Sequence, residues 1–281
     1  MKKTLLLALL ALNGCAMMGG SGSGPGVERM YVINCGENHV KDLSRWTPGV
    51  NIGKAHVFGN HCYLIRHASG WMLWDTGNAD ALAARPDGLV VANGLITVFM
   101  RKPLAESLKD IGVAPGDIKH FAMSHAHGDH AGNANQFTAA TLYVQRAEYA
   151  AMFGPEPQKF GFVPSNFDKL RSNPAMIIDG DHDVFGDGSV LLKAAPGHTP
   201  GHQVLVVRLP RTGRVMLSGD MVHLQYSWNY GVVPSFNFDI PRSQRTMDEM
   251  RNYAKSTGAT LWVNHDREQH VPIPKSPQYV E

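Results

Sequence analysis

The sequence predicts a layered α/β domain with mixed sheets, and two observations lead to this fold class. Short apolar runs of strand character recur along the chain, and helical patterns fall between some of them. Strands in hairpin-like pairs that are interrupted by helices are typical of layered α/β proteins. No Pro- or Gly-rich linker divides residues 27–281 and no solenoid or propeller repeat is visible, so we expect one domain there.

The elements follow from the same patterns. One helix is expected from Pro103 to about Ile111, where Gly112 stops it, and another from Pro241 to about Lys255. The predicted strands are Tyr31–Asn34, Tyr63–Ile65, Trp71–Trp74, Phe121–Met123, Leu142–Gln145, Val190–Lys193, Val204–Leu209, Val215–Leu217 and Leu261–Val263.

The first residues are expected to form a signal peptide, 1–15, followed by a flexible Gly/Ser linker, 16–26. Two Lys precede an apolar run, Leu5–Leu12, that is too short to span a bilayer as a permanent helix. The run ends in "LNGC", which resembles a bacterial lipobox with Cys15 as the lipidated residue, although cleavage near Ala16 is an alternative. We therefore expect export to the periplasm or a lipid anchor at the outer membrane.

The net charge limits the classes of partner that the protein is expected to bind. With 26 Lys and Arg against 24 Asp and Glu, the net charge of +2 provides no basic footprint for nucleic acid. The expected partner is a small molecule, and a membrane is contacted only through the lipid anchor.

Cys35 and Cys62 lie in strand-like stretches, where they either form a disulfide, as an exported protein allows, or stay reduced and buried. Neither has the spacing of a zinc site.

The stretch "SHAHGDHAG", residues 124–132, follows a predicted buried strand and is dense in metal-ligand side chains. His125 and His127, two apart, can face one ion, and Asp129 and His130 after the turn can face a second. Without a cation, so many imidazoles and carboxylates would be costly to bury, which argues against an ordinary polar loop. Further ligand-type residues follow later predicted strands: His198 in "AAPGHTPGH", Asp220 in "VMLSGD" and His265 in "LWVNHD".

These motifs, with "WDTG" at residues 74–77, resemble the metallo-β-lactamase superfamily, in the branch that holds N-acyl-homoserine lactonases. The resemblance extends over about residues 30–270 and implies a four-layer αββα sandwich with the metal site at one edge of the sheets. It implies a first metal on His125, His127 and His198, a second on Asp129, His130 and His265, and Asp220 between them. Zinc suits these ligands best, while iron, manganese or cobalt can occupy such sites.

The resemblance also implies the chemistry. Two divalent ions lower the pKa of a shared water toward about 7, and the resulting hydroxide attacks the ester carbonyl of a lactone. Asp129 could pass the proton to the leaving group. The sequence has no G-x-S-x-G motif, so a serine nucleophile is not favoured.

Residues near the ligands are assigned by position. His223, where many of these lactonases have Tyr, could donate a hydrogen bond to the substrate, and Tyr226 is a substitute for the missing phenol. His202, Asp266 and Asp75 are expected to brace the ligand loops. Two apolar stretches, 88–100 and 224–238, could line a pocket for an acyl chain or form ordinary core or a dimer contact. The expected substrate contacts are Phe99, Tyr226, Trp228 and Phe236.

The favoured function is therefore a metal-dependent hydrolase that opens N-acyl-homoserine lactones and so quenches quorum signals. The alternatives on the same metals are a β-lactamase, a phosphotriesterase or arylesterase, and a thioesterase similar to glyoxalase II, whose usual basic C-terminal segment is not visible here. A non-catalytic metal-binding protein is a further alternative. A homodimer is expected by resemblance only.

Overall fold

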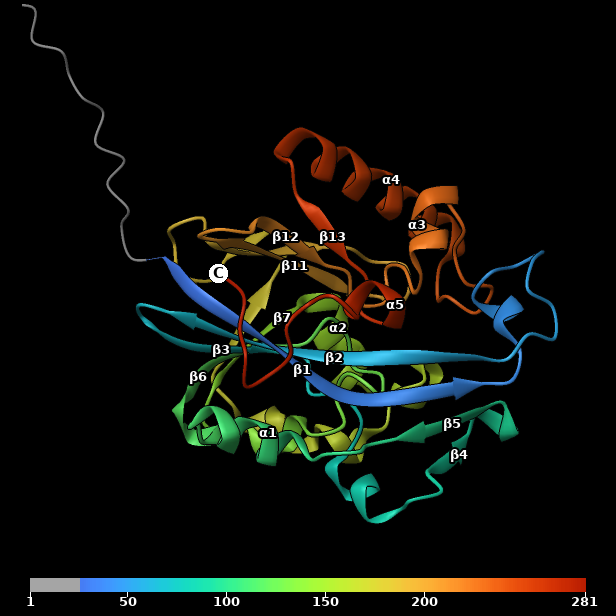
Figure 1. Ribbon diagram of the computed structural model, residues 1–281, viewed down its shortest axis with the longest axis horizontal. Coiled ribbons are helices and arrows are strands. Elements are labelled where there is room, and N and C mark those ends of the chain that lie inside the picture. The colour runs from blue at the N-terminus through green and yellow to red at the C-terminus, as the bar shows by residue number, and fades with distance from the viewer. Residues whose placement is uncertain (1–25) are drawn as a thin grey trace, which may run out of the picture.

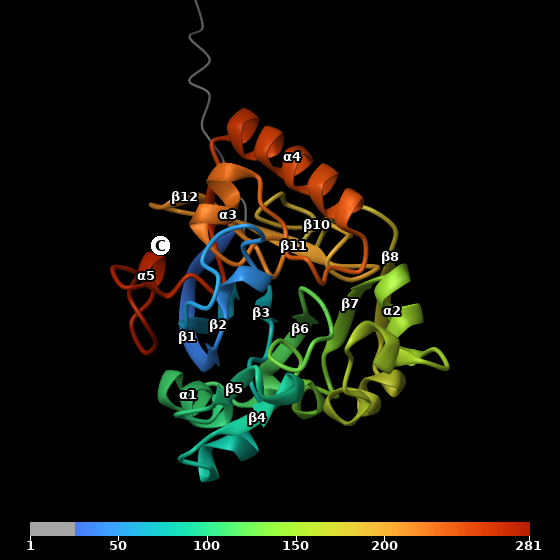
Figure 2. The ribbon, with the colours of Figure 1, turned by 90° about the vertical axis from the view of Figure 1, so that its right-hand side faces the viewer.

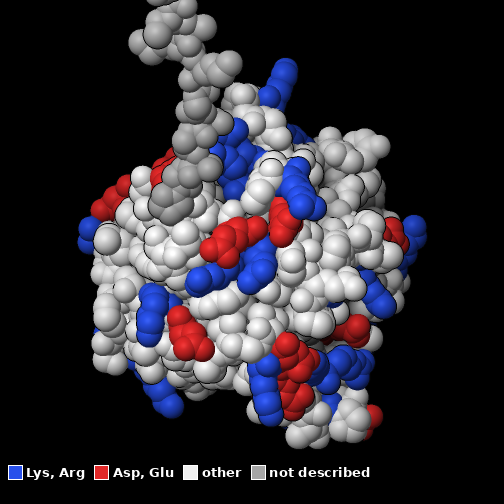
Figure 3. All heavy atoms as spheres, turned by 60° about the vertical axis from the view of Figure 1, so that its left-hand side comes forward, with Lys and Arg blue, Asp and Glu red and all other residues white. Residues whose placement is uncertain are grey.

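The structure is a computed structural model that describes residues 26–281. The predictions of a signal peptide, of a lipidated Cys15 and of nearly all of the linker lie outside these residues. None of the helices within 26–281 is long and apolar enough to cross a membrane. On the face that Figure 3 presents, acidic and basic side chains are intermixed, which agrees with the small net charge.

Two sheets form the centre of the domain. The first has eight strands in the order β4-β5-β1-β2-β3-β6-β7-β8, and the second has five in the order β13-β12-β11-β10-β9. Both sheets are mixed, with parallel pairing of β3, β6, β7 and β8 and of β12 with β13. The strands are β1 Val27–Val40, β2 His56–His67, β3 Gly70–Trp74, β4 Leu89–Val91, β5 Ile96–Phe99, β6 Ile118–Ala122, β7 Thr141–Gln145, β8 Ala175–Ile178, β9 His182–Asp183, β10 Val190–Ala194, β11 Gln203–Leu209, β12 Gly213–Leu217 and β13 Thr260–Trp262.

Helices cover the outer face of each sheet, so the predicted αββα sandwich is confirmed (Figures 1 and 2). Alternation along β1 builds two cores, because successive side chains point to opposite faces. Met30 and Val32 pack between the sheets, whereas Tyr31 and Ile33 pack toward the helices of the first sheet. The helices are α1 Leu104–Ile111, α2 Arg146–Phe153, α3 Gln225–Tyr230, α4 Ile240–Thr257 and α5 Arg267–His270.

Both predicted helices are present within a residue or two of their expected ends. Gly112 after α1 and Gly258 after α4 adopt the left-handed conformation that ends a helix, with φ of 78° and 70°. The sequence did not predict α2, which has no side-chain cap, or α3 and α5, which are very short. It also missed β4 and β5 within the apolar stretch 88–100.

Strands β1 and β2 run well beyond the predicted segments. The second half of β1 carries polar side chains, and its register shifts between Asn34 and Gly36, so the apolar pattern ends long before the strand does. Cys35 of β1 and Cys62 of β2 form a disulfide, with their Cα atoms 5.8 Å apart. Of the two alternatives that the sequence left open, the structure has the bonded one.

A partly buried contact between Asp187 and His67 at the far end of β2 gives a test of the fold. Asp187 lies 3.0 Å from Nε2 of the buried His67 and accepts a hydrogen bond from the Ser189 backbone. Burial alone would raise the pKa of Asp187, but the hydrogen bonds from Ser189 and His67 outweigh it and lower the pKa to about 2.

We expect Asp187→Asn to lower the free energy of unfolding by about 1 kcal/mol at pH 7, since solvent reaches the carboxylate and weakens the pair. The folded-state pKa lies below the unfolded value, so this stabilisation is present above about pH 4 and is lost as the pH falls toward 2. Urea unfolding at pH 7 and pH 2.5 measures the difference. An equal deficit at both pH values would show that the ionised carboxylate of Asp187 does not contribute.

Candidate metal centre

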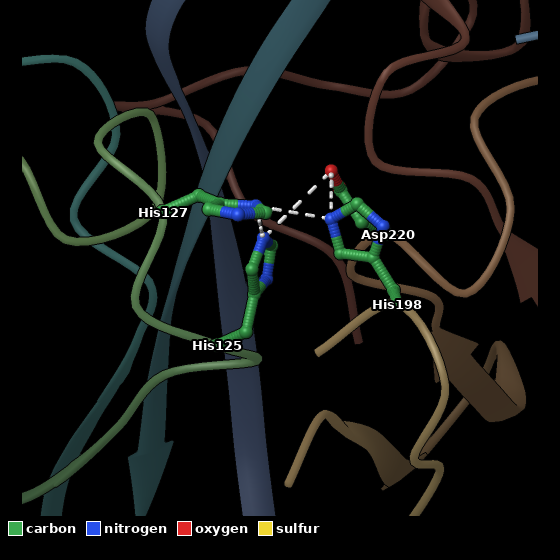
Figure 4. A group of neighbouring side chains, drawn as sticks. All are labelled: His125, His127, His198 and Asp220. Atoms are coloured by element: carbon green, nitrogen blue, oxygen red, sulfur yellow. Dashed lines mark hydrogen bonds and ion pairs between the residues drawn. The ribbon is translucent and has the colours of Figure 1, made fainter. Parts of the chain in front are cut away.

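Four loops at one edge of the two sheets supply the predicted ligands. The loop after β6 carries the "SHAHGDHAG" motif, and the loop between β10 and β11 carries His198. Asp220 and His265 directly follow β12 and β13 of the second sheet. Figure 4 shows His125 and His127 reaching from one side toward His198 and Asp220 on the other. The site is therefore built from both halves of the sandwich.

The first group consists of His125, His127, His198 and Asp220, whose ligand atoms all lie within 4.8 Å of one another. His127 Nδ1 is 2.8 Å from His125 Nε2 and 3.0 Å from His198 Nε2. Asp220 Oδ2 lies 3.3 Å from His198 Nε2.

The second group consists of Asp129, His130 and His265 and meets the same criterion. The two imidazoles approach with their Nε2 atoms 3.3 Å apart. The other oxygen of Asp220, Oδ1, lies 3.0 Å from His130 Nε2 and 2.9 Å from His265 Nε2. Asp220 thus faces the first group with one oxygen and the second group with the other.

The outward nitrogens of the five imidazoles are all engaged elsewhere. His130 Nδ1 lies 2.9 Å from the Asp75 carboxylate, and His198 Nδ1 lies 2.9 Å from Asn237 Oδ1. His127 Nε2 and His265 Nδ1 meet the backbone oxygens of Phe160 and Gly59, and His125 Nδ1 meets the Ser124 hydroxyl. Such contacts fix the ring orientation of metal-ligating histidines and leave the inward nitrogens to face one another.

Together with Asp220, these inward nitrogens fit divalent cations. Burial lowers the pKa of His125 well below its ordinary value, so its lone pair is free. Asp220 Oδ1 is buried and receives no hydrogen bond, although two imidazole nitrogens lie about 3 Å away. Burial alone would raise the pKa of Asp220, but His223, His265 and His130 hold it well below its ordinary value, so it stays a carboxylate. Lone pairs that converge on a buried carboxylate are the donor set of divalent metal ions.

His223 joins this cluster. Its Nε2 lies 2.9 Å from Asp220 Oδ2, and its ring lies parallel to that of His265 with the centroids 5.4 Å apart. Asp220, His223 and His265 form a further group within metal-binding distance. Burial lowers the pKa of His223 to about 4, and the nearby Asp220 offsets only part of that effect. The imidazole is therefore neutral at pH 7.

The three residues expected to brace the ligand loops, Asp75, His202 and Asp266, each accept a backbone hydrogen bond from another loop. Asp75 accepts hydrogen bonds from the Ser124 backbone at 2.6 Å and from its hydroxyl at 3.0 Å. His202 Nε2 accepts the backbone N–H of Asp220 at 2.9 Å. Asp266 caps α5 and accepts the backbone N–H of Gln225 at 2.8 Å. Each brace joins two loops that are distant in sequence.

Among the four predicted substrate contacts, only Phe236 lies in the aromatic surroundings of the cluster. Its ring centroid is 6.1 Å from that of His198 and 6.2 Å from that of His223. Phe99 lies on the other side of the first sheet from the cluster. It is paired with Glu37 of β1, and its ring packs on His39. Asn38, whose side chain reaches Asp129, points to the opposite face of β1.

The two predicted substrate contacts on α3, Tyr226 and Trp228, pack against other residues than the ligand groups. The side chain of Trp228 packs against the core under α4 and against Arg251. Tyr226 packs on Tyr230, with the ring centroids 4.7 Å apart, and is not among the aromatic rings found around His223. The sequence could not show these directions, because it did not predict the helix that sets them.

Several residues of the site carried no sequence signal. Asn38 Nδ2 donates to Asp129 Oδ2 at 2.7 Å, and Asn60 donates to the backbone oxygen of Asp129. The rings of Trp46 and Phe58 pack beside His223 with centroids 6.3 and 6.1 Å away. All four lie on or between the polar ends of β1 and β2, far from any motif.

Known proteins resemble the chain in sequence and in structure. The metallo-beta-lactamase superfamily matches residues 56–256. The N-acyl homoserine lactonase AttM of Azorhizobium caulinodans is 32% identical over 228 residues, which are 78% of this chain and 86% of that protein. The N-acyl homoserine lactonase AiiA of Bacillus thuringiensis subsp. kurstaki is 30% identical over 263 residues, which are 90% and 99% of the two chains.

A solved structure of an N-acyl homoserine lactone hydrolase, with the product N-hexanoyl-L-homoserine bound at its catalytic metal centre, superposes with a TM-score of 0.80 at 28% identity. The match covers 91% of this chain and 100% of the other. The fold and the site thus define a metal-dependent hydrolase of the metallo-β-lactamase superfamily. Within that superfamily, the chain belongs to the branch of the N-acyl homoserine lactonases.

Proposed function

We propose that this protein opens the ester ring of N-acyl-homoserine lactones and so destroys quorum signals. The observation that carries the proposal is the convergence of both ligand groups on Asp220 in a chain whose relatives are named for this reaction. The product-bound metal centre of the similar solved structure supports it further.

We assign a first divalent ion to His125, His127 and His198 and a second to Asp129, His130 and His265, with Asp220 shared between them. Zinc is the proposed metal, with iron, manganese or cobalt as alternatives. When bound, such ions supply a nucleophilic water at neutral pH and polarise the substrate carbonyl. The protein contributes the fixed ligand geometry described above.

Asp129 is the proposed proton carrier. Its side chain is partly exposed, whereas the neighbouring His130 and His265 are buried, so it is the member of the second group that solvent reaches. Asn38 donates to Oδ2 and Asn60 holds the backbone oxygen, which together fix the carboxylate and leave Oδ1 free of hydrogen bonds. Oδ1 can therefore hold a proton and deliver it to the alkoxide that leaves the opened ring.

His223 is the proposed donor to the substrate carbonyl. Because it is neutral at pH 7, it carries one N–H. Its Nε2 lies 2.9 Å from Asp220 Oδ2, so this N–H would turn from Asp220 to the carbonyl of a bound substrate. The rings of Trp46, Phe58 and Phe236 pack beside it, and of these the exposed Phe236 offers an apolar surface on which an acyl chain can pack.

We expect His223→Ala to lower the turnover number about 100-fold, as the loss of one aligned donor does, while both metals are kept. Metal analysis and initial lactone-opening rates measured together test this, with the half-exposed His39→Ala as a control that changes neither. An unchanged rate would remove His223 from the mechanism. Loss of a metal would instead make His223 a ligand.

The test of the function is a substrate panel on the purified, zinc-loaded protein. Acid release would be followed from hexanoyl- and decanoyl-homoserine lactones, beside a β-lactam, an aryl ester, a phosphotriester and a glutathione thioester. Fast opening of the lactones with slow reaction of the others supports the proposal. If the lactones stay intact and another substrate of the panel is cleaved rapidly, the protein is a hydrolase of that substrate class instead.

We also propose that the protein is exported, and the Cys35–Cys62 disulfide supports this, because such bonds persist in oxidising compartments. The lipid on Cys15 and the homodimer stay predictions. Fractionation of the producing cells tests export and lipidation, since a lipoprotein partitions with membranes and an unanchored periplasmic protein is released by osmotic shock. Light scattering of the purified domain tests the dimer.

A further inference from the structure

The buried carboxylate of Glu148 joins the two loops that carry the histidines of the first metal group. Glu148 lies in the first turn of α2 and is 2% exposed. Its Oε1 accepts the backbone N–H of Ala126 at 3.0 Å, and Ala126 lies between His125 and His127. It is therefore attached to the motif loop at the position between two predicted ligands.

The other oxygen of Glu148 holds the second loop. Oε2 accepts the Thr199 hydroxyl at 2.8 Å and the backbone N–H of Gly201 at 2.9 Å. Thr199 directly follows His198, so this oxygen is one residue away from the third ligand of the group. One carboxylate thus spans the loop after β6 and the loop between β10 and β11.

The packing at Gly201 shows independently that this junction is close-fitting. A Cβ atom at Gly201 would lie 2.2 Å from the backbone nitrogen of Glu148 and 2.7 Å from its Cβ. Only glycine allows the loop to approach α2 this closely. Burial raises the pKa of Glu148 to about 7, an effect that its hydrogen bonds to Thr199, Gly201 and Ala126 oppose. All three contacts donate to the carboxyl group, so they favour its ionised form.

We propose that Glu148 is a positioning residue that sets the spacing of His125, His127 and His198 and thereby the affinity of the first metal site. It touches none of the three imidazoles and acts through the backbones beside them. The inference rests on the metal assignment proposed above and not on the choice of lactone as substrate.

Glu148→Gln tests the inference with almost no change in size. An amide can accept at one end only, so its NH₂ group must face Ala126 or Gly201, whose backbone N–H groups cannot accept. Zinc titration of the metal-stripped full chain against a chromophoric chelator yields both dissociation constants, and His198→Ala identifies which belongs to the first group. We expect the first constant to rise 10- to 100-fold in Glu148→Gln and the second to change much less.

Matched variants keep the result interpretable. Thr199→Val removes one of the three contacts and should weaken the first site about 10-fold, whereas Thr199→Ser keeps the hydroxyl and the wild-type constant. Gly201→Ala should weaken the same site by steric displacement. Glu156→Gln, an exposed carboxylate paired with Lys159, should change neither constant.

Two outcomes would overturn the inference. One is a wild-type first-site constant in Glu148→Gln, and the other is equal weakening of both sites. If Glu148→Gln does not fold, the contrast between Thr199→Val and Thr199→Ser decides in the same way. A protein that binds zinc as expected but leaves lactones intact would contradict the proposed function and leave the role of Glu148 standing.

Discussion

Replacing Asp220 with Ala is expected to reduce lactone opening about 1,000-fold or more, because the protein then loses the one carboxylate that faces both ligand groups. Without it, His130, His198 and His265 surround a site with less negative charge. Metal content should fall below two ions per chain.

Asp220→Asn separates charge from shape in this experiment. The amide keeps the size of the side chain but offers one accepting oxygen instead of two, so we expect an intermediate metal content and a rate close to that of Asp220→Ala. Elemental analysis of the dialysed proteins and initial rates on the same samples measure both effects. An Asp220→Ala protein with two tightly bound ions and the wild-type rate would contradict the proposed metal site.

The second large effect is expected at Asp75, and it concerns stability. Asp75 is fully buried and is held at a φ of 57°, where Ala is strained and Asn is tolerated. Removing its carboxylate leaves the Ser124 backbone N–H without its acceptor, and His130 Nδ1 keeps only the Ser124 hydroxyl, 3.1 Å away, as a partner. We expect Asp75→Ala to lower the free energy of unfolding by about 3 kcal/mol.

Urea unfolding measures this loss, and two variants define its cause. Asp75→Asn keeps the backbone conformation and one acceptor, so it should retain part of the stability. Asp87→Ala, on an exposed turn, should stay within about 0.5 kcal/mol of the wild type. If Asp75→Ala unfolds at the wild-type urea concentration, the buried carboxylate does not hold the motif loop.

Local pattern explains which parts of this structure the sequence predicted. The apolar runs that became β3, β6, β11 and β12 are strands buried against a core, so hydrophobicity alone marks them. The sequence did not predict the distal half of β1 because this half is polar. Its Asn38 donates a hydrogen bond to Asp129 and does not pack in a hydrophobic core. Short helices such as α3 gave no periodic signal, so the sequence could not show where the side chains of Tyr226 and Trp228 point.

The proposed ligands could be selected from the sequence for a different reason. Their residue types cluster within a few positions or follow strands directly, and the resemblance then ordered them. Their supports were less visible, because each belongs to a segment far away in sequence. Glu148 and Asn237 look like ordinary surface residues until the fold brings them beside His198 and its loop.

The two sheets contribute different ligands, and this division links metal supply to the cohesion of the whole domain. Ions that bind the folded chain and not the unfolded one add stability in proportion to the logarithm of their free concentration, about 1.4 kcal/mol for each tenfold excess over the dissociation constant at each site. The melting temperature should therefore respond to the supply of the divalent metal that the site takes. A cell that withholds this metal would shorten the lifetime of the protein as well as lower its activity.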